Sequence, residues 1–322
     1  MDGLILDVPQ IPSAGIPGNA VRMNVGSLYN KGIELSINAT PVKGKEFSWN
    51  TSFNIGINKN EVTALAPGLS SIIVTTPAGA STNESVSASL PGYSVGTLKV
   101  VRTGGVDPAT GRRIFYNAAG QAVLYSHYPQ AWRFADGATS PAITLNDGMP
   151  LYNAIPKQIG GWNNTFSYQG FELDVLLTYQ LGFYIYYGTN AGLHDQRFWN
   201  SSTDILDHWK KAGDVAQWPK IVYGDNVSNG SSLPLDINVF KGDFVKLRNV
   251  QVSYNLPKTL VSKAGLGSIK FYVSGQNLAM ITDYPGPDPE VSTNGNNSAN
   301  PGIDRNQVGN ARTITVGVSV GF

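Results

Sequence analysis

The sequence predicts an all-β protein, a segment of an antiparallel transmembrane β-barrel with long extracellular loops and about nine complete strands plus the end of a tenth. Residues 312–322 alternate strictly between apolar and small or polar side chains and end on an aromatic residue. Charged residues make up only 14% of the 322 residues, against about 25% in an average soluble domain. No apolar run of about 18 residues is present, so such a chain would cross a membrane only as part of a closed barrel.

The charge and cysteine content exclude several classes of function. The formal net charge is +1 and like charges do not gather in runs, which disfavours a nucleic-acid partner. The absence of cysteine excludes a disulfide scaffold and cysteine zinc sites. Residues 1–7 lack the basic start and long apolar core of a secretory signal. We therefore expect an exported parent protein whose beginning lies outside this sequence.

The first predicted elements are two long strands joined by a short link. Residues 4–8 are expected to be the end of an earlier strand, and residues 9–23, which are rich in proline and glycine, a loop. Apolar side chains then alternate with polar ones over residues 33–40 and 47–58. Between these two strands a link contains Gly44, which suits a tight turn.

Irregular stretches flank a weaker strand signal in the next part of the chain. Residues 66–95 are rich in Ser, Thr, Ala, Gly and Pro and predict a long loop. Residues 96–102 and 112–116 are candidates for a hairpin, because the turn between them has Asp107 before a proline and ends on a glycine.

The clearest hairpin joins residues 162–168 to residues 171–179 through the two-residue turn Gln169–Gly170. The second strand is about 26 Å long at about 3.3 Å per residue. Tilted by about 40°, it rises about 20 Å, close to the ~25 Å apolar band of outer-membrane barrels. Its alternate side chains include Glu172 and Asp174, which suit a wet lumen better than a sandwich core.

The chain after residue 200 contains one predicted helix and three long strands. Residues 201–211 are expected to be helical, capped by a Ser-Ser-Thr-Asp start and closed by Gly213. Strands are predicted at 244–256, 269–276 and 312–322. In these and the preceding hairpin we expect three apolar residues to face the lumen and pack on a plug: Leu176, Val245 and Leu247.

The lengths of the connections give an independent test, because bacterial barrels have short periplasmic turns and long outer loops. Counting back from a last strand that ends in the periplasm, the short links at 41–45, 169–170 and 257–265 all fall on the periplasmic side. The long connections fall on the outside: 66–95, 119–158, 188–237 and 281–309. The alternation of short and long connections therefore agrees with a barrel.

Several motifs together resemble the C-terminal part of the SusC/RagA-type TonB-linked outer-membrane transporters. They cover most of the chain in the family's order: Asn24–Leu35 (NVGSLYNKGIEL), Gly105–Gly111 (GVDPATG), Ile155–Tyr168 (IPKQIGGWNNTFSY), Phe244–Pro257 (FVKLRNVQVSYNLP) and Gly275–Leu278 (GQNL). The closing strand, with Val318, Val320 and the terminal Phe322, resembles the signal by which outer-membrane barrels are recognised for insertion.

The resemblance implies a location, a fold and a function. It implies a barrel of about 22 strands with a plugged lumen in the outer membrane of a Gram-negative cell. It implies TonB-energised import of an oligosaccharide or peptide under a SusD-like surface lipoprotein that acts as a lid. Because the signal peptide and plug domain are not in this sequence, we expect residues 1–322 to be the C-terminal part of such a barrel, reaching the TonB complex through the N-terminal part.

No residue pattern points to an enzyme, a cofactor or a metal centre. The three histidines lie scattered in predicted loops, and the nucleophile and phosphate-loop motifs are not found. His194 with Asp195, and a second group of Asp204, Asp207 and His208, can be drawn as metal ligands, but short polar residues are ordinary in surface loops. The carboxylates of Asp283–Glu290 offer oxygen ligands for calcium, yet a rigid proline-rich loop is the simpler interpretation.

Aromatic residues near the expected outer rim are the candidate contacts for a substrate or a lid. They are Tyr184, Tyr186, Tyr187, Trp199, Trp209 and Trp218. Aromatic faces stack on sugar rings and anchor protein interfaces. The ordinary alternatives are a membrane girdle for the tyrosines and packing inside the loops for the tryptophans.

Two other functions use the same strand pattern. A secreted all-β adhesin or carbohydrate-binding module would use the alternation to fill a sandwich core. A plain porin-like channel would have the barrel without a plug.

Overall fold

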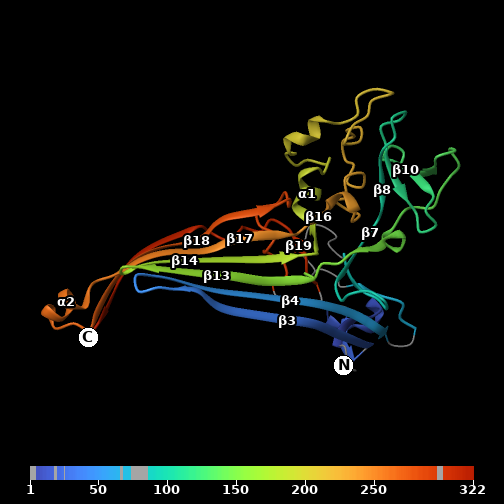
Figure 1. The fold of residues 1–322 in the computed structure, drawn as a ribbon. Helices are drawn as coiled ribbons and strands as arrows, with labels where there is room; N and C mark the ends of the chain where they lie inside the picture. Colours follow the sequence, from blue (N-terminus) through green and yellow to red (C-terminus); the bar gives the residue numbers. More distant parts are fainter. Residues whose placement is uncertain (1–4, 18–19, 25, 66–67, 74–85, 296–299) are drawn as a thin grey trace.

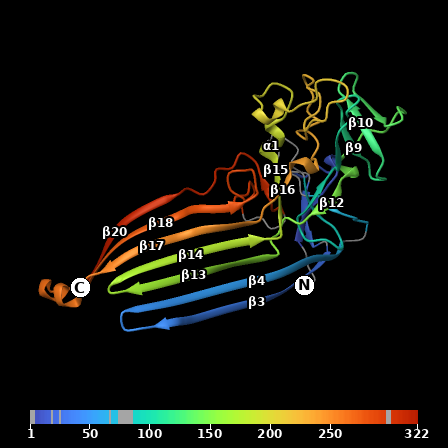
Figure 2. The same ribbon diagram turned by 45° about the horizontal axis from the view of Figure 1, so that its top comes forward.

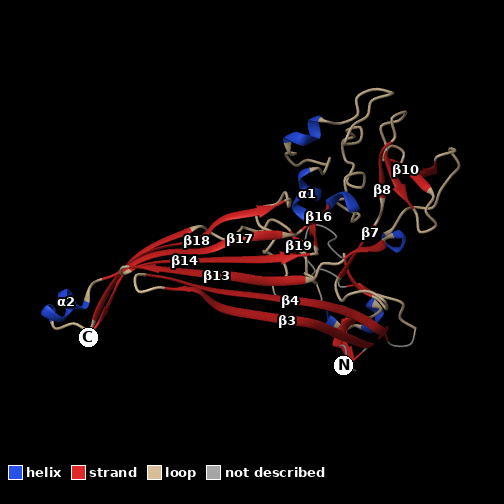
Figure 3. Cartoon of the chain, viewed as in Figure 1, coloured by secondary structure: helices blue, strands red, loops and turns tan. Residues whose placement is uncertain are grey.

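The computed structural model describes the chain except for residues 1–4, 18–19, 25, 66–67, 74–85 and 296–299. Strands dominate it, and the helices are few and short (Figures 1 and 3). Among the described residues no helix has the length and apolar character needed to cross a membrane.

The main element is a seven-stranded antiparallel sheet in the order β20-β18-β17-β14-β13-β4-β3. Its strands are β3 (Gly26–Lys43), β4 (Phe47–Leu65), β13 (Gln158–Tyr168), β14 (Phe171–Leu181), β17 (Phe244–Asn255), β18 (Ser268–Thr282) and β20 (Thr313–Gly321). The strands lie side by side as a curved wall that does not close within the described residues (Figure 2). All seven were predicted from the alternation of side chains.

Short turns and long loops segregate to opposite ends of this wall (Figure 1). Gln169 and Gly170 both have positive φ, 45° and 89°, as a two-residue type I′ hairpin requires. At the same end, α2 (Lys258–Val261) and the 3-10 turn η6 (Ser262–Ala264) join β17 to β18. The predicted alternation of short and long connections is therefore confirmed.

The two faces of the wall differ in chemistry, and the strand register keeps them separate. Ile33 pairs with Ile57, Trp162 pairs with both Phe53 and Leu177, and Val252 lies between Leu173 and Val273. Five of these eight side chains remain exposed, with Ile33 at 73% and Val252 at 50%, and the other three are half-buried. On the other face polar groups bond to one another, as where Asp174 accepts hydrogen bonds from Thr165 (2.8 Å) and Asn163 (3.1 Å). An exposed apolar face of this extent is a surface for lipid or for another protein.

The prediction that Val245 and Leu247 face the lumen is wrong. Val245 pairs with Tyr179 and Leu247 with Leu177, so both belong to the apolar outer face. The register shifts after Leu247, where a bulge at Arg248 inserts one residue and reverses the alternation. Leu176 pairs with Asn249 and stays on the inner face.

The candidate hairpin at 96–116 is not part of the wall. Its residues form β7 (Thr97–Val100), β8 (Thr103–Val106) and β9 (Arg113–Tyr116), which belong to two smaller sheets. Leu98, Val100 and Phe115 are fully buried, whereas a wall strand has one face exposed. The wall in the described residues therefore has seven complete strands, two fewer than predicted.

The two smaller sheets belong to the long connections. One has the order β12-β7-β6-β5 and the other β11-β10-β9-β8. Their remaining strands are β5 (Ile72–Ile73), β6 (Ser87–Ser89), β10 (Ala122–Ser126), β11 (Ala131–Phe134) and β12 (Met149–Tyr152), with the 3-10 turn η3 (Leu145–Asp147) before β12. They lie at the loop end of the wall (Figure 3).

Further short elements complete the fold. The residues expected to end an earlier wall strand form β1 (Ile5–Pro9), which is not part of the seven-stranded sheet. It pairs with β2 (Ala20–Asn24), most of which lies in the stretch expected to be a loop, with η1 (Pro12–Ala14) between them. A three-stranded sheet contains β15 (Tyr184–Tyr187), β16 (Val239–Lys241) and β19 (Ile303–Asp304). The elements α1 (Gly188–Leu193), η4 (Thr203–Leu206) and η5 (Asp236–Asn238) lie in the connection between β15 and β16.

The helix predicted over 201–211 is reduced to the single 3-10 turn η4. Ser202 makes no side-chain capping bond. The backbone N–H of Trp209 instead donates to the carbonyl of Trp218, and that of Trp218 donates to the carbonyl of Asp207. This extended pairing draws the chain away from a helical path.

Candidate functional site

The long loops at one end of the wall pack into one body, which is the candidate functional region. Segments 97–143 and 233–237 share a core of Val101, Phe115, Val123, Tyr125, Ile143, Leu233 and Leu235. Val101 makes two backbone hydrogen bonds to the second segment. Its N–H donates to the Pro234 carbonyl, and its carbonyl accepts from the Asp236 N–H. Loops far apart in the sequence are thus held as a fixed platform.

A stack of three buried side chains lies inside this platform. The His194 ring stacks on Trp218 with the centroids 3.7 Å apart, and the Arg113 guanidinium carbon lies 5.7 Å from the Trp218 ring. Burial lowers the pKa of Arg113 to about 10. Trp218 is 3% exposed and therefore belongs to the platform core.

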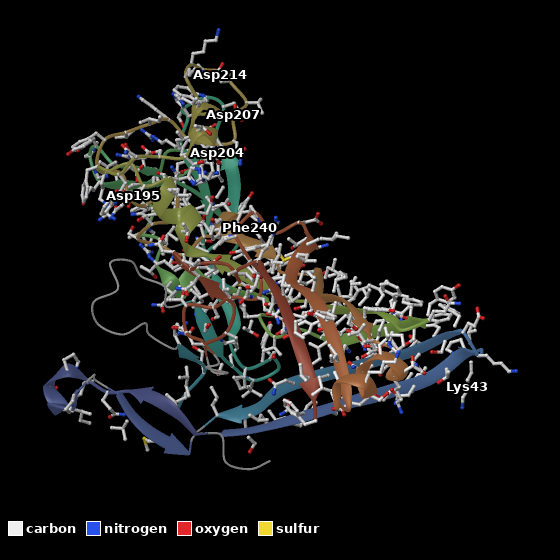
Figure 4. The ribbon with its side chains drawn as sticks, turned by 90° about the vertical axis from the view of Figure 1, so that its left-hand side faces the viewer. Lys43, Asp195, Asp204, Asp207, Asp214 and Phe240 are labelled. Atoms are coloured by element: carbon white, nitrogen blue, oxygen red, sulfur yellow. The ribbon has the colours of Figure 1, made fainter. Side chains whose placement is uncertain are left out.

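The residues considered as metal ligands are engaged in hydrogen bonds and ion pairs. His194 Nε2 lies 2.8 Å from Asp204 Oδ1, and His194 Nδ1 lies 2.7 Å from the Asn190 carbonyl. Asp195 pairs with Arg197 at 2.6 Å. Asp207 lies in the same region (Figure 4). Within the described residues no three His, Asp or Glu side chains gather in a way that would hold a metal ion.

The six candidate aromatic residues do not form one cluster. Tyr186 is 2% exposed and packs in a core with Leu98 and Ile303, so it joins Trp218 among the buried members. Tyr184 and Tyr187 are half-buried and lie against Tyr152 and Tyr284 respectively.

The other two tryptophans differ in their exposure. Trp209 is half-buried, and its indole N–H donates to the Pro108 carbonyl at 2.9 Å. Trp199 is 55% exposed and lies beside Phe198, which is 70% exposed, with the ring centroids 4.6 Å apart. Phe198 was not among the predicted contacts, although two adjacent aromatic residues in a polar loop are a recognisable signal.

A charged cluster ties the loop after β18 to the inner face of the wall. Lys246 Nζ lies 2.9 Å from Asp288 and 2.7 Å from Glu290, and Arg248 pairs with Glu290. Lys246 is 2% exposed and Asp288 4%. The side-chain amide of Asn310 also donates to Asp288, at 2.9 Å. Two of the carboxylates considered for calcium therefore have protein cations as partners.

The protonation of these carboxylates follows from their partners. Burial opposes the charged form of Asp288, but the Lys246 ammonium and the backbone N–H groups of Glu290 and Asn310 hold its pKa below the usual range. Burial likewise opposes ionisation of Glu290, and its bonds to Arg248 and Lys246 lower its pKa. Both carboxylates are therefore ionised at neutral pH and clamp the loop to the wall.

Comparison with known proteins gives relatives along the whole chain. No family model matches it. It is 29% identical over 309 residues to the TonB-dependent receptor P3 of Formosa agariphila, covering 93% of this chain and 29% of the relative. It is 26% identical over 333 residues to the TonB-dependent receptor SusC of Bacteroides thetaiotaomicron, covering 99% of this chain and 29% of SusC. The chain thus spans about a third of the length of the relatives it matches.

Solved structures show the same fold. The RagAB peptide transporter aligns with 99% of this chain at a TM-score of 0.77 and 22% identity, using 32% of its own chain. The RagAB peptide importer in its 'open-open' state aligns with 100% of this chain at a TM-score of 0.73 and 21% identity.

Proposed function

We propose, from the homology of this chain over its whole length to the SusC/RagA-type TonB-dependent receptors, that residues 1–322 are the C-terminal part of the barrel of a nutrient importer. TonB-dependent receptors are outer-membrane β-barrel transporters and not enzymes. The observation that carries the proposal is the seven-stranded wall with an exposed apolar outer face and a hydrogen-bonded polar inner face. An adhesin or sandwich module would bury the apolar face.

The parent barrel in this proposal has about 22 strands and a plugged lumen. The edge strands β3 and β20 pair with strands from the rest of the parent, because an open edge leaves backbone groups unsatisfied in lipid. The inner face, with Leu176 and its polar neighbours, packs against the plug. The TonB complex acts through the N-terminal part of the parent protein.

The substrate we propose is a peptide or an oligosaccharide, and the partner is a SusD-like lipoprotein that covers the loops. The solved structures with the same fold are those of a peptide transporter, so a peptide is the first substrate class to test. Phe198 and Trp199 support a lid contact, because exposed neighbouring aromatic side chains are typical interface anchors. Tyr184, Tyr187 and Trp209 are half-buried and remain candidate contacts, whereas Tyr186 and Trp218 support the platform from inside.

Uptake in the native cell tests this function. Deleting the parent gene should abolish uptake of labelled oligopeptides or oligosaccharides, and the wild-type gene should restore it. The double variant Phe198→Ala/Trp199→Ala should weaken copurification with the lid lipoprotein by about tenfold or more, because interface anchors contribute about 2 kcal/mol or more.

The matched control is Val308→Ala, which truncates another exposed apolar loop residue, 88% exposed. It should leave copurification unchanged. Unchanged uptake of every tested peptide and glycan after gene deletion would contradict the proposed import function.

A further inference from the structure

A cavity of about 780 Å³ lies where β3 and β4 meet the loops. Its floor includes Ile33 and Ile57, and its walls include Tyr93, Leu151, Tyr152 and Pro156. Ile33 and Ile57 are paired residues of the exposed apolar face, so this part of the cavity lining lies on the outer side of the wall. It is continuous with the surface that faces lipid in the proposed importer.

Two lysines lie directly above this apolar floor. Lys31 and Lys59 also line the cavity. They lie on the same face as Ile33 and Ile57, two residues nearer the loop end of each strand. The two lysines are register partners across β3 and β4. Like charges placed opposite each other on a sheet are destabilising unless an anion lies between them.

The other polar groups around the lysines hold them in place. Both ammonium nitrogens lie over the Tyr29 ring, at 5.3 Å for Lys31 and 5.9 Å for Lys59. Glu61 pairs with Lys59 at 2.8 Å and accepts a hydrogen bond from the Tyr29 hydroxyl at 2.8 Å. Lys157 also lines the cavity, so three ammonium groups and one carboxylate give its lining a net positive charge.

We propose that this cavity binds a phosphate-bearing lipid of the outer leaflet, with an acyl chain on Ile33, Ile57 and Leu151 and a phosphate between Lys31 and Lys59. The inference rests on the membrane placement proposed above. Ammonium groups bind phosphate through strong charge-assisted hydrogen bonds, and the boundary of an apolar band is where lipid headgroups meet lysine and tyrosine. An apolar floor beneath a cationic mouth matches the two parts of such a lipid.

Native mass spectrometry of the full-length parent protein in detergent tests the site. The probes are lipid A with two phosphates, its dephosphorylated form, and inorganic phosphate as a competitor. The variant Lys31→Gln/Lys59→Gln should weaken binding of phosphorylated lipid A by about tenfold or more, because two charge-assisted contacts are lost. The variant Lys31→Arg/Lys59→Arg should retain binding.

The matched control is Lys43→Gln/Lys45→Gln at the turn end of the same strand pair, where Figure 4 places Lys43 far from the loops. It should bind phosphorylated lipid A like the wild type. Equal affinity of the wild type for dephosphorylated lipid A, an unchanged affinity in Lys31→Gln/Lys59→Gln, or full competition by millimolar inorganic phosphate would each overturn the lipid site. All variants should reach the outer membrane, and absence of the wild type from that membrane would overturn the proposed function instead.

Discussion

Replacing Lys246 with alanine should release the loop that follows β18, at a cost of about 3–5 kcal/mol, because it leaves a buried carboxylate without its cation. Lys246 binds Asp288 and Glu290 within 3.0 Å, and Asp288 is 4% exposed. Hydrogen exchange of the backbone amides of residues 283–295 and 300–312 in the full-length protein measures the release. Those amides should exchange much faster in the variant.

The matched control is Lys270→Ala, which breaks another ion pair on the inner face of the same wall. Lys270 lies 3.0 Å from Glu172, but both side chains are about a third exposed, so the expected cost is about 0–1 kcal/mol. Equal protection of the loop in Lys246→Ala and wild type would show that the charged cluster does not anchor it.

The same clamp has a defined pH dependence. The folded-state pKa values of Asp288 and Glu290 lie below their ordinary values, so the stabilisation is present above the unfolded-state values of about 4. It is lost as the pH falls through the lowered folded-state values. Loop protection should therefore stay constant between about pH 5 and pH 8 and fall only in stronger acid.

Deleting Phe322 should remove most of the parent barrel from the outer membrane while leaving its synthesis intact. Phe322 is fully exposed and follows Gly321, the last residue of β20. An exposed side chain of this kind contributes about 0.5 kcal/mol or less to folding stability. The expected loss therefore reflects recognition during insertion, in which Val318 and Val320 of the same face take part.

The amount of heat-modifiable barrel in purified outer membranes is the measurement for this variant. Phe322→Asp should behave like the deletion, and Phe322→Tyr, which keeps an aromatic ring, should insert normally. A normal amount of barrel after deletion would show that Phe322 is not needed for insertion and only contacts the membrane boundary.

The wall could be predicted from the sequence because each of its strands has one apolar and one polar face. The same logic failed at Val245 and Leu247, where the face depends on a bulge. The signal was present as a step of three positions, in place of two, from Leu247 to Val250 in an otherwise strict alternation. A step of that kind indicates an inserted residue. The inserted residue is Arg248, whose side chain pairs with Glu290.

The loop platform could not be predicted in the same way, because its strands are too short for a side-chain alternation to stand out. Val100, Val101 and Phe115 acquire their environment from segments more than a hundred residues away, such as the one that contains Leu235. The exposure of the candidate site residues could not be predicted either. Trp199 and Trp218 look alike in the sequence, yet one is exposed and the other is stacked on His194.

A nitroxide scan along β14 tests the central claim, that the apolar face of this wall lies in lipid. Single cysteines at positions 171 to 179 would be spin-labelled in an otherwise cysteine-free full-length protein reconstituted in bilayers. Oxygen, which concentrates in lipid, should relax the labels at 171, 173, 175, 177 and 179 strongly and the labels at the even positions weakly, because successive side chains point to opposite faces. Accessibility without a two-residue period, or with its maxima at the even positions, would contradict the account.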